Sequence, residues 1–197
     1  NIRQALSKVI EIRKFASQEL KLPDNSSYTS YADLERSFVV WNVFAAPELS
    51  VKLKRWCFLQ VGCVNYQGFF SQSQSEQHAE ELRREGYDVH VGGVRAYSTL
   101  GWFSDPVLNT FIGYPEMHLA RLIFHELAHQ VVFVPGDTMF NESFATAVEQ
   151  EGIRRWFAYN GTVIQQAELT ARQDRERVFV ELILKYRRKL QELFGSD

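Results

Sequence analysis

The stretch that decides the fold of this chain is EMHLARLIFHELAHQVVFVPGDTMFNESFAT, residues 116–146. The apolar spacing in its first half predicts an amphipathic helix over Glu116–Val132, which Pro135 and Gly136 end. A second helix is predicted over Asn141–Tyr159. The apolar face expected to anchor the first helix to the core consists of Ala120, Ile123, Phe124, Leu127 and Val131.

Outward from this stretch, the rest of the chain predicts an α+β protein. Helical spacing marks residues 1–20, 73–84 and 163–194, whereas β-branched and aromatic runs predict strands over Phe38–Ala45, Arg55–Gln60, Val64–Phe70 and Tyr87–Val94. A polar loop over Leu22–Tyr31 and an irregular aromatic segment over Ala96–Pro115 connect these elements. We expect a single domain, with a helix and a small mixed sheet in residues 1–115 and helices in residues 116–197.

Composition excludes several classes of protein. The 197 residues include 22 Lys and Arg against 24 Asp and Glu, so no bulk positive charge favours nucleic acid. A hydrophobic share of 45% excludes a disordered chain, and no apolar run approaches the roughly 20 residues that span a bilayer. Cys57 and Cys63 cannot form a disulfide scaffold, and they are expected either as buried thiols or as one local disulfide.

The motif His-Glu-Leu-Ala-His at residues 125–129 carries the chemistry. On a helix, His125 and His129 lie one turn apart on the same face, where both imidazoles can bind one tetrahedral Zn²⁺. Glu126 lies beside them and can take a proton from an activated water molecule. The alternative for the two histidines is a solvated or core position without a metal.

A catalytic zinc needs a third protein ligand and one open position. Glu142, at the start of the second helix, is the candidate, because the intervening turn can bring it back over the first helix. Its alternative role is a carboxylate favoured by the helix dipole. Glu149 and, less strongly, Asp137 are candidates to orient a ligand histidine, with a solvated charge as the alternative for Glu149.

The residue that stabilises the oxyanion is expected among three tyrosines, Tyr97, Tyr114 and Tyr159, of which Tyr97 is favoured. Each could instead be a core or rim aromatic. His118 could touch substrate, although a solvent-exposed position at the helix start fits it better. Asp105 or Glu149 could bind the substrate's α-amino group.

The motifs together resemble a family. His-Glu-x-x-His followed by Asn-Glu-x-Phe-Ala is similar to the gluzincin metallopeptidases. Five phrases resemble more closely the predicted bacterial aminopeptidases carried as exported lipoproteins: SYTSYADLERSFVVWNVFAAPELS, WCFLQVGCVNYQGFF, VGGVRAYSTLGWFSDPVLNT, LIFHELAHQ and FNESFATAVE. The resemblance implies a zincin-like fold, with His125, His129 and Glu142 as zinc ligands and Glu126 as general base. It also implies export to the periplasm with a lipid anchor upstream of Asn1.

The expected function is therefore a zinc peptidase, with one Zn²⁺ per chain and a peptide substrate, acting as an aminopeptidase in the cell envelope. The Gly-x-Met-x-Asn signature of alanyl-type aminopeptidases is absent, so endopeptidase activity stays open. Two alternatives are an envelope binding or assembly module with a structural zinc, and a protease dedicated to one partner protein. No nucleic acid is expected as a partner, the membrane is expected only through the anchor, and the oligomeric state is left open.

Overall fold

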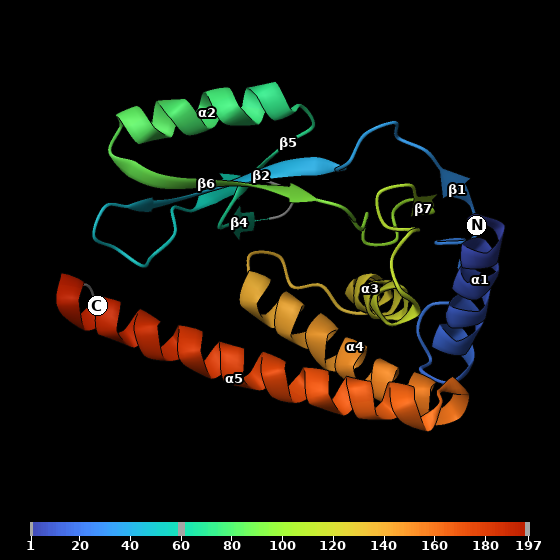
Figure 1. Cartoon of the computed structure of the whole chain (residues 1–197). Helices are drawn as coiled ribbons and strands as arrows, with labels where there is room; N and C mark the ends of the chain where they lie inside the picture. Colours follow the sequence, from blue (N-terminus) through green and yellow to red (C-terminus); the bar gives the residue numbers. More distant parts are fainter. Residues whose placement is uncertain (1, 59–61, 196–197) are drawn as a thin grey trace. The chain divides into compact units, whose positions relative to one another are not determined.

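The computed structural model describes residues 2–58 and 62–195 and shows the expected α+β fold, with strands in the N-terminal half and helices in the C-terminal half (Figure 1). The helices are α1 (Ile2–Gln18), α2 (Gln72–Arg84), α3 (Glu116–His129), α4 (Thr138–Asn160) and α5 (Val163–Phe194). The strands are β1 (Tyr31–Ala32), β2 (Val40–Pro47), β3 (Trp56–Phe58), β4 (Gly62–Val64), β5 (Gln67–Phe69), β6 (Tyr87–Val94) and β7 (Val107–Leu108).

The chain divides into two compact units. The first contains residues 1–40, 58–63 and 93–156, and the second contains residues 41–57, 64–92 and 157–197. The candidate site lies in the first unit. The expectation of one domain over the whole chain stays a prediction.

The second unit contains a small sheet and α2. Its strands lie in the order β5–β2–β6, and β2 pairs antiparallel with β5 so that Trp41 faces Phe69. Figure 1 shows α2 lying over one face of this sheet. Gly86 follows the end of this helix and lies in the left-handed region at φ +87°. The core between helix and sheet contains Val43, Ala45, Ala79 and Leu82.

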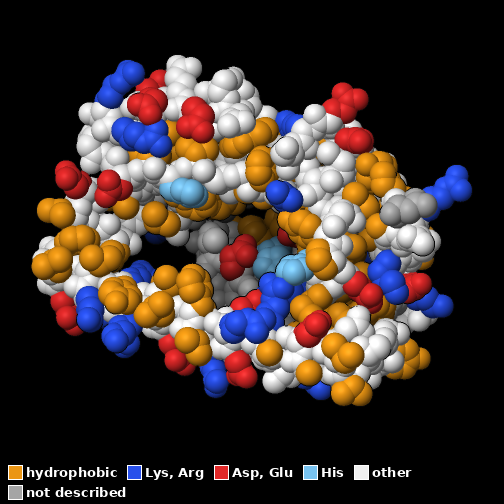
Figure 2. All heavy atoms as spheres, in the orientation of Figure 1, with side chains coloured by type: hydrophobic (Ala, Val, Ile, Leu, Met, Phe, Trp, Pro, Cys, Tyr) orange, Lys and Arg blue, Asp and Glu red, His pale blue; other side chains and the backbone are white. Residues whose placement is uncertain are grey.

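The long helix α5 also belongs to the second unit. Thr162 and Gln165 form a capping box at its start, and Gly195 caps its end in the left-handed conformation. Leu169 is its buried residue among those described. An apolar seam along this helix is exposed, and Figure 2 shows orange side chains between charged ones along the helix. The seam residues are Phe179, Ile183, Tyr186, Leu190 and Leu193.

The first unit is built around the contact of α1 with α3. Phe15 of α1 lies 6.1 Å from Phe124 of α3 and makes an edge contact of 5.1 Å with Trp156 of α4, both between ring centroids. These rings are buried, and burial of large aromatic side chains dominates the energetics of such cores. The three helices therefore form a rigid support for the residues on α3 and α4.

Gly152 allows α4 to approach α3 closely. A Cβ atom at this position would lie 2.7 Å from Cδ2 of Phe124 and 2.9 Å from Cδ1 of Leu20. Such distances are shorter than the van der Waals contact of two carbon atoms, so any larger residue would push the helices apart. The glycine therefore sets the spacing that brings the carboxylates of α4 toward the histidines of α3.

Two predicted elements have wrong bounds, and one residue expected in the core is exposed. The expected strand Val64–Phe70 is interrupted, because residues 65 and 66 lie in a bend between β4 and β5. The expected helix Glu116–Val132 ends at His129, and Val131, expected in the core, is 49% exposed. Residues 130 and 131 form a turn after the helix, and residues 132–134 have no regular secondary structure before the Pro-Gly turn.

Two short strands, β1 and β7, were not predicted from the sequence. β1 pairs in parallel with β7, with Tyr31 opposite Val107 and Ala32 opposite Leu108. β7 lies inside the segment expected to be irregular, and two-residue strands are too short to show a periodic pattern. In the expected strand Arg55–Gln60, β3 is present over Trp56–Phe58, and residues 59–60 lie outside the described residues.

The cysteines are disulfide-bonded, which decides between the two states left open for Cys57 and Cys63. Across the described part of the chain, no helix has the length and apolarity needed to cross a membrane.

Candidate metal centre

The two histidines of the motif lie on one face of α3, where His125 is half-buried and His129 is buried. Ile123, Phe124 and Leu127 are fully buried and hold the opposite face. His125 and His129 follow each other by one turn, with their Nε2 atoms 3.2 Å apart and their rings at 83°. The helix therefore presents two imidazole nitrogens to one point, as the i, i+4 spacing predicts.

Glu142 reaches the same point from the first turns of α4. Its Oε2 lies 3.2 Å from His125 Nε2, and its Oε1 lies 3.6 Å from His129 Nε2. The neighbouring Asn141 is buried and holds this end of the helix. The Asn141 side chain accepts a hydrogen bond from Val134 N at 2.8 Å and donates one to Val134 O at 2.9 Å. The loop between the two helices is thereby fastened beside Glu142.

The residues present fit a metal ion. Ligand atoms of His125, His129 and Glu142 all lie within 4.8 Å of one another. Zinc bonds of about 2.0–2.2 Å to nitrogen and oxygen imply about 3.3–3.6 Å between neighbouring ligand atoms of a tetrahedron. The separations of 3.2 and 3.6 Å agree with that geometry. Two imidazoles and one carboxylate are also a donor set of catalytic zinc sites.

Glu149 holds the other ring nitrogen of His125. Its Oε2 lies 3.0 Å from His125 Nδ1, and its Oε1 accepts a hydrogen bond from Arg121. Glu149 is 8% exposed, so this carboxylate bridges the two groups away from solvent. A carboxylate on Nδ1 fixes the ring orientation and leaves Nε2 directed at the metal position.

Acidic neighbours control the protonation of the histidines. Burial lowers the pKa of His125, but hydrogen bonds with Glu142 and Glu149 and the charges of Glu126 and Glu142 outweigh it, raising that pKa to about 10. Burial lowers the pKa of His129. The hydrogen bond with His125 lowers the pKa of Glu142. In the metal-free protein, one proton on His125 therefore occupies the place that a cation would take.

Glu126 has the acidity of a general base. Burial raises its pKa from 4.5 to about 7, against the opposing charge of His125 and with the support of Glu142, Asp105 and Glu149. A base with a pKa near the working pH can both accept and return a proton. The acidic surroundings therefore suit Glu126 for proton transfer.

The predicted tyrosines lie in different environments. Tyr97 is 54% exposed, and Tyr114 makes an edge contact with His118 at 6.1 Å between ring centroids. Tyr159 is 81% exposed and belongs to the second unit. The assignment of Tyr97 as oxyanion donor stays a prediction.

The other residues that the sequence offered as candidates, His118, Asp137 and Asp105, make contacts within the protein. His118 is half-buried, rather than solvent-exposed as expected, and it packs against Tyr114. Asp137 accepts a hydrogen bond from Phe140 N at 3.0 Å and so caps the start of α4. Asp105 is buried and accepts a hydrogen bond from Thr99 N. A substrate contact for His118 and an amino-group contact for Asp105 stay predictions.

Sequence reasoning missed Arg121 and the anchoring role of Asn141. Arg121 lies one turn before His125, and the i, i+4 spacing could have placed it on the same face. The Asn141–Val134 hydrogen bonds had no such signal, because an amide side chain pairs with backbone only after the loop has folded.

A helix–loop–helix that brings two histidines and a glutamate together, with a second glutamate between the histidines, defines a candidate metal-dependent hydrolase site in an α+β fold. The chain belongs to the family described as "Putative aminopeptidase", whose model matches residues 1–197. No curated protein and no solved structure shows significant similarity to it.

Proposed function

We propose that this protein is a zinc-dependent metallopeptidase of the gluzincin type, an aminopeptidase that hydrolyses short peptides. Family membership supports a peptidase. The observation that carries the metal assignment is the convergence of His125, His129 and Glu142, with 3.2 Å between the histidine nitrogens. His125, His129 and Glu142 would hold one Zn²⁺ per chain.

Zinc bound there would supply Lewis acidity to a water molecule and to the scissile carbonyl. The chain's own residues carry the proton. Glu126 takes a proton from the attacking water and returns it to the amine as the peptide bond breaks. Its raised pKa, about 7, suits both transfers. Glu149 keeps the His125 ring in place through Nδ1, while Arg121 donates a hydrogen bond to that carboxylate and orients it.

We also propose that the protein acts in the bacterial cell envelope, attached by a lipid anchor upstream of Asn1. This proposal rests on the resemblance of the sequence to exported lipoproteins. The disulfide-bonded state of Cys57 and Cys63 is consistent with an oxidising compartment.

The test of the peptidase assignment uses matched fluorogenic peptides with free and acetylated N-termini. We expect the zinc-loaded protein to cleave only peptides with a free amine, and Glu126→Gln to abolish this cleavage. Cleavage of both kinds would identify an endopeptidase. If the zinc-loaded protein cleaved neither kind of peptide, the result would contradict hydrolysis of generic peptides. It would favour a structural zinc or a dedicated substrate.

The metal assignment is tested separately by metal content. We expect about one zinc per chain after reconstitution and its loss in His129→Ala. His90→Ala, which removes a histidine of the second unit, is the matched control and should bind zinc like the wild type. Zinc retention by His129→Ala would contradict the proposed ligand set.

A further inference from the structure

The segment that joins the two ligand-bearing helices, residues 130–137, sets the place of Glu142 relative to the histidines. Helix α3 ends at His129, and Glu142 lies near the start of α4. The carboxylate of Glu142 lies 3.2 Å from His125 Nε2 and 3.6 Å from His129 Nε2, so a small movement of the segment would separate the ligands. Whatever holds this segment therefore also holds the third candidate ligand.

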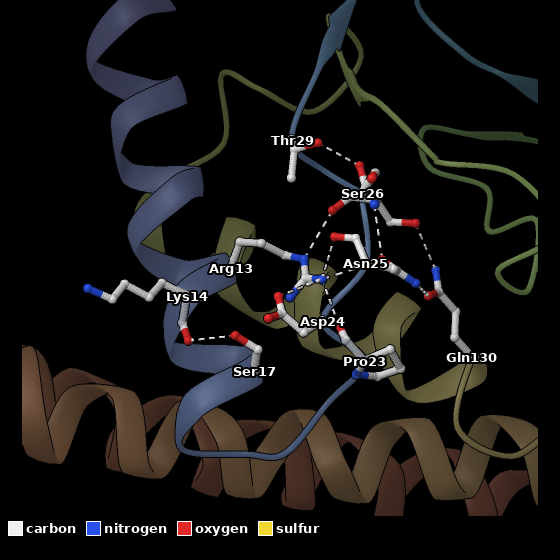
Figure 3. Close-up of polar contacts among 10 residues, drawn as sticks. Arg13, Lys14, Ser17, Pro23, Asp24, Asn25, Ser26, Thr29 and Gln130 are labelled. Atoms are coloured by element: carbon white, nitrogen blue, oxygen red, sulfur yellow. Dashed lines mark hydrogen bonds and ion pairs between the residues drawn. The ribbon is translucent and has the colours of Figure 1, made fainter.

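The first end of the segment is tied to the polar loop before β1 (Figure 3). Gln130 directly follows His129. Asn25 Nδ2 donates to Gln130 Oε1 at 2.7 Å, and Gln130 Nε2 donates to Ser27 Oγ at 3.3 Å. The segment therefore starts from a place that side chains of another part of the chain fix.

The loop that holds Gln130 is itself fastened to α1. Arg13 of α1 is 5% exposed. Its guanidinium donates to three backbone oxygens of the loop, Ser27 O at 3.0 Å, Pro23 O at 2.6 Å and Asn25 O at 2.9 Å. A buried arginine can satisfy several carbonyls at once because its donors form a planar fork. With this end fixed, the place of Glu142 depends on the other end of the segment.

The other end of the segment is a tight turn over residues 134–137. Asp137 N donates to Val134 O at 3.2 Å, and Gly136 lies at φ +82°. A proline at the second position and a glycine at positive φ at the third are typical of a type II turn. Asn141 joins the turn to α4, because its side chain makes two hydrogen bonds with Val134 and its N–H donates to Asp137 O at 3.1 Å. The turn and the start of α4 therefore form one piece.

This turn lies directly against the backbone of β4 at Gly62. A Cβ atom at Gly62 would lie 2.7 Å from Gly136 N, 2.8 Å from Gly136 Cα and 3.3 Å from Pro135 C. Such distances are shorter than van der Waals contact, so only glycine fits, and the φ of +75° at Gly62 also favours glycine. The backbones of β4 and the turn are thus in contact with no side chain between them.

A disulfide bond restrains the backbone beside Gly62. Cys63 follows Gly62 and is disulfide-bonded to Cys57, and β3 and β4 pair with each other. Glycine has the greatest conformational freedom of the residues, so a support built on a glycine needs a restraint from its neighbours. The covalent bond supplies that restraint where the turn is supported.

We propose that Gly62 and the disulfide bond beside it position Glu142 as a metal ligand, by supporting the turn over residues 134–137. Gly62 contacts the turn and binds no metal itself, so it is a positioning residue. This inference rests on the metal assignment in the proposed function.

The first test is Gly62→Ala, whose added methyl group would meet the backbone of Gly136 and displace the turn. We expect zinc affinity, measured by competition with a chromophoric chelator, to fall about tenfold or more, as for other groups that orient metal ligands. Gly86→Ala is the matched control. Gly86 has a similar φ of +87°, but a Cβ atom there would meet nothing within 4 Å, so zinc affinity should equal that of the wild type.

Cobalt(II) in place of zinc gives a readout that a loss of stability alone would not move. The visible absorption spectrum of bound cobalt depends on the geometry of its ligands. We expect this spectrum to change in Gly62→Ala and to stay the same in Gly86→Ala.

The double variant Cys57→Ser/Cys63→Ser tests the support without adding a methyl group, and it keeps the test open if Gly62→Ala does not fold. We expect it to show a lower zinc affinity and a changed cobalt spectrum as well. Wild-type affinity and spectrum in either folded variant would overturn the inference. Wild-type protein that binds zinc, with the expected changes in the variants, but cleaves no peptide would defeat the proposed peptidase function alone.

Discussion

Two glutamates on the same helix, Glu149 and Glu151, show how burial changes the use of an ion pair. Glu149 is 8% exposed and joins Arg121 to His125 of another helix. Glu151 is half-exposed, and hydrogen bonds with Arg154 and Arg155 at 2.7 Å lower its pKa to about 2.

Both carboxylates pair with arginine, but their partners lie at different separations along the sequence. Glu151 pairs with residues three and four positions away on its own helix, where water competes and screens the charges. Glu149 bridges residues 24 and 28 positions away in sequence. An exposed pair can thus change a pKa strongly without fixing tertiary structure, whereas the buried one orients a candidate metal ligand. The predictions below test this difference between buried and exposed polar groups.

The largest effect on activity is expected from substitution of the buried base, Glu126. Glu126→Gln preserves size but cannot accept the proton, so we expect kcat to fall by about 10²–10⁴ while zinc remains bound. Hydrolysis rates and zinc content of the same preparation check this outcome. Normal turnover in this variant would sink the proposed mechanism.

The buried cation Arg13 should matter far more for stability than an exposed arginine. Arg13→Met leaves three loop carbonyls without their donor, and we expect the free energy of unfolding to fall by about 2–4 kcal/mol. Urea denaturation of the metal-free protein measures this change. Arg154→Met is the control, because its exposed pair with Glu151 should give no resolvable change. Equal effects in both variants would contradict the importance of burial.

The comparison of the two glutamates is tested directly by amide substitution. Glu149→Gln removes the charge that holds His125, and we expect zinc affinity to fall about 10- to 100-fold. Glu151→Gln should leave zinc affinity unchanged. Competition with a chromophoric chelator measures both affinities. An equal loss in the two variants would indicate a general charge effect instead of orientation of the histidine.

The smallest expected effect is the release of a proton when zinc binds. The pKa of His125, raised from 6.5 to about 10, means that its proton stabilises the metal-free fold fully below pH 6.5. This contribution is lost as the pH rises through about 10. Zinc needs the neutral ring, so binding near pH 8 should release about one proton, and affinity should fall as the pH falls.

Calorimetry of zinc binding in two buffers with different ionisation enthalpies counts the released protons. His125→Gln should release fewer than the wild type. If the wild type released none at pH 8, His125 would already be neutral in the metal-free protein.

Much of the fold could be predicted because its signals are local. The strand predicted over Tyr87–Val94 has these bounds in the structure. The helix predicted over residues 73–84 is present as α2. Within the strand, Gly93 lies against the Phe38 ring, whose atoms a Cβ atom there would meet at 2.5 Å. The pair of β1 and β7 was missed because two-residue strands have no period and depend on a partner distant in sequence.

In the candidate site, too, one part follows from local sequence spacing and another part depends on packing. The helical spacing of His125 and His129 is enough to place them on one face, since the α-helix repeats every 3.6 residues. The place of Glu142 beside them depends on a loop that Asn141 fastens and on the close helix contact that Gly152 allows. Sequence spacing made Glu142 a candidate, but only packing could bring its oxygens near both rings.

By itself the sequence determined the class of fold, the helices and the paired imidazoles, because short-range periodicity and motif spacing control these features. Only the tertiary structure decided the bridge from Arg121 through Glu149 to His125, and the burial of Tyr28 within the loop that Arg13 holds. These contacts join residues that are far apart in sequence or carry no periodic signal. Their geometry comes from packed helices and satisfied buried hydrogen bonds, which no local pattern encodes.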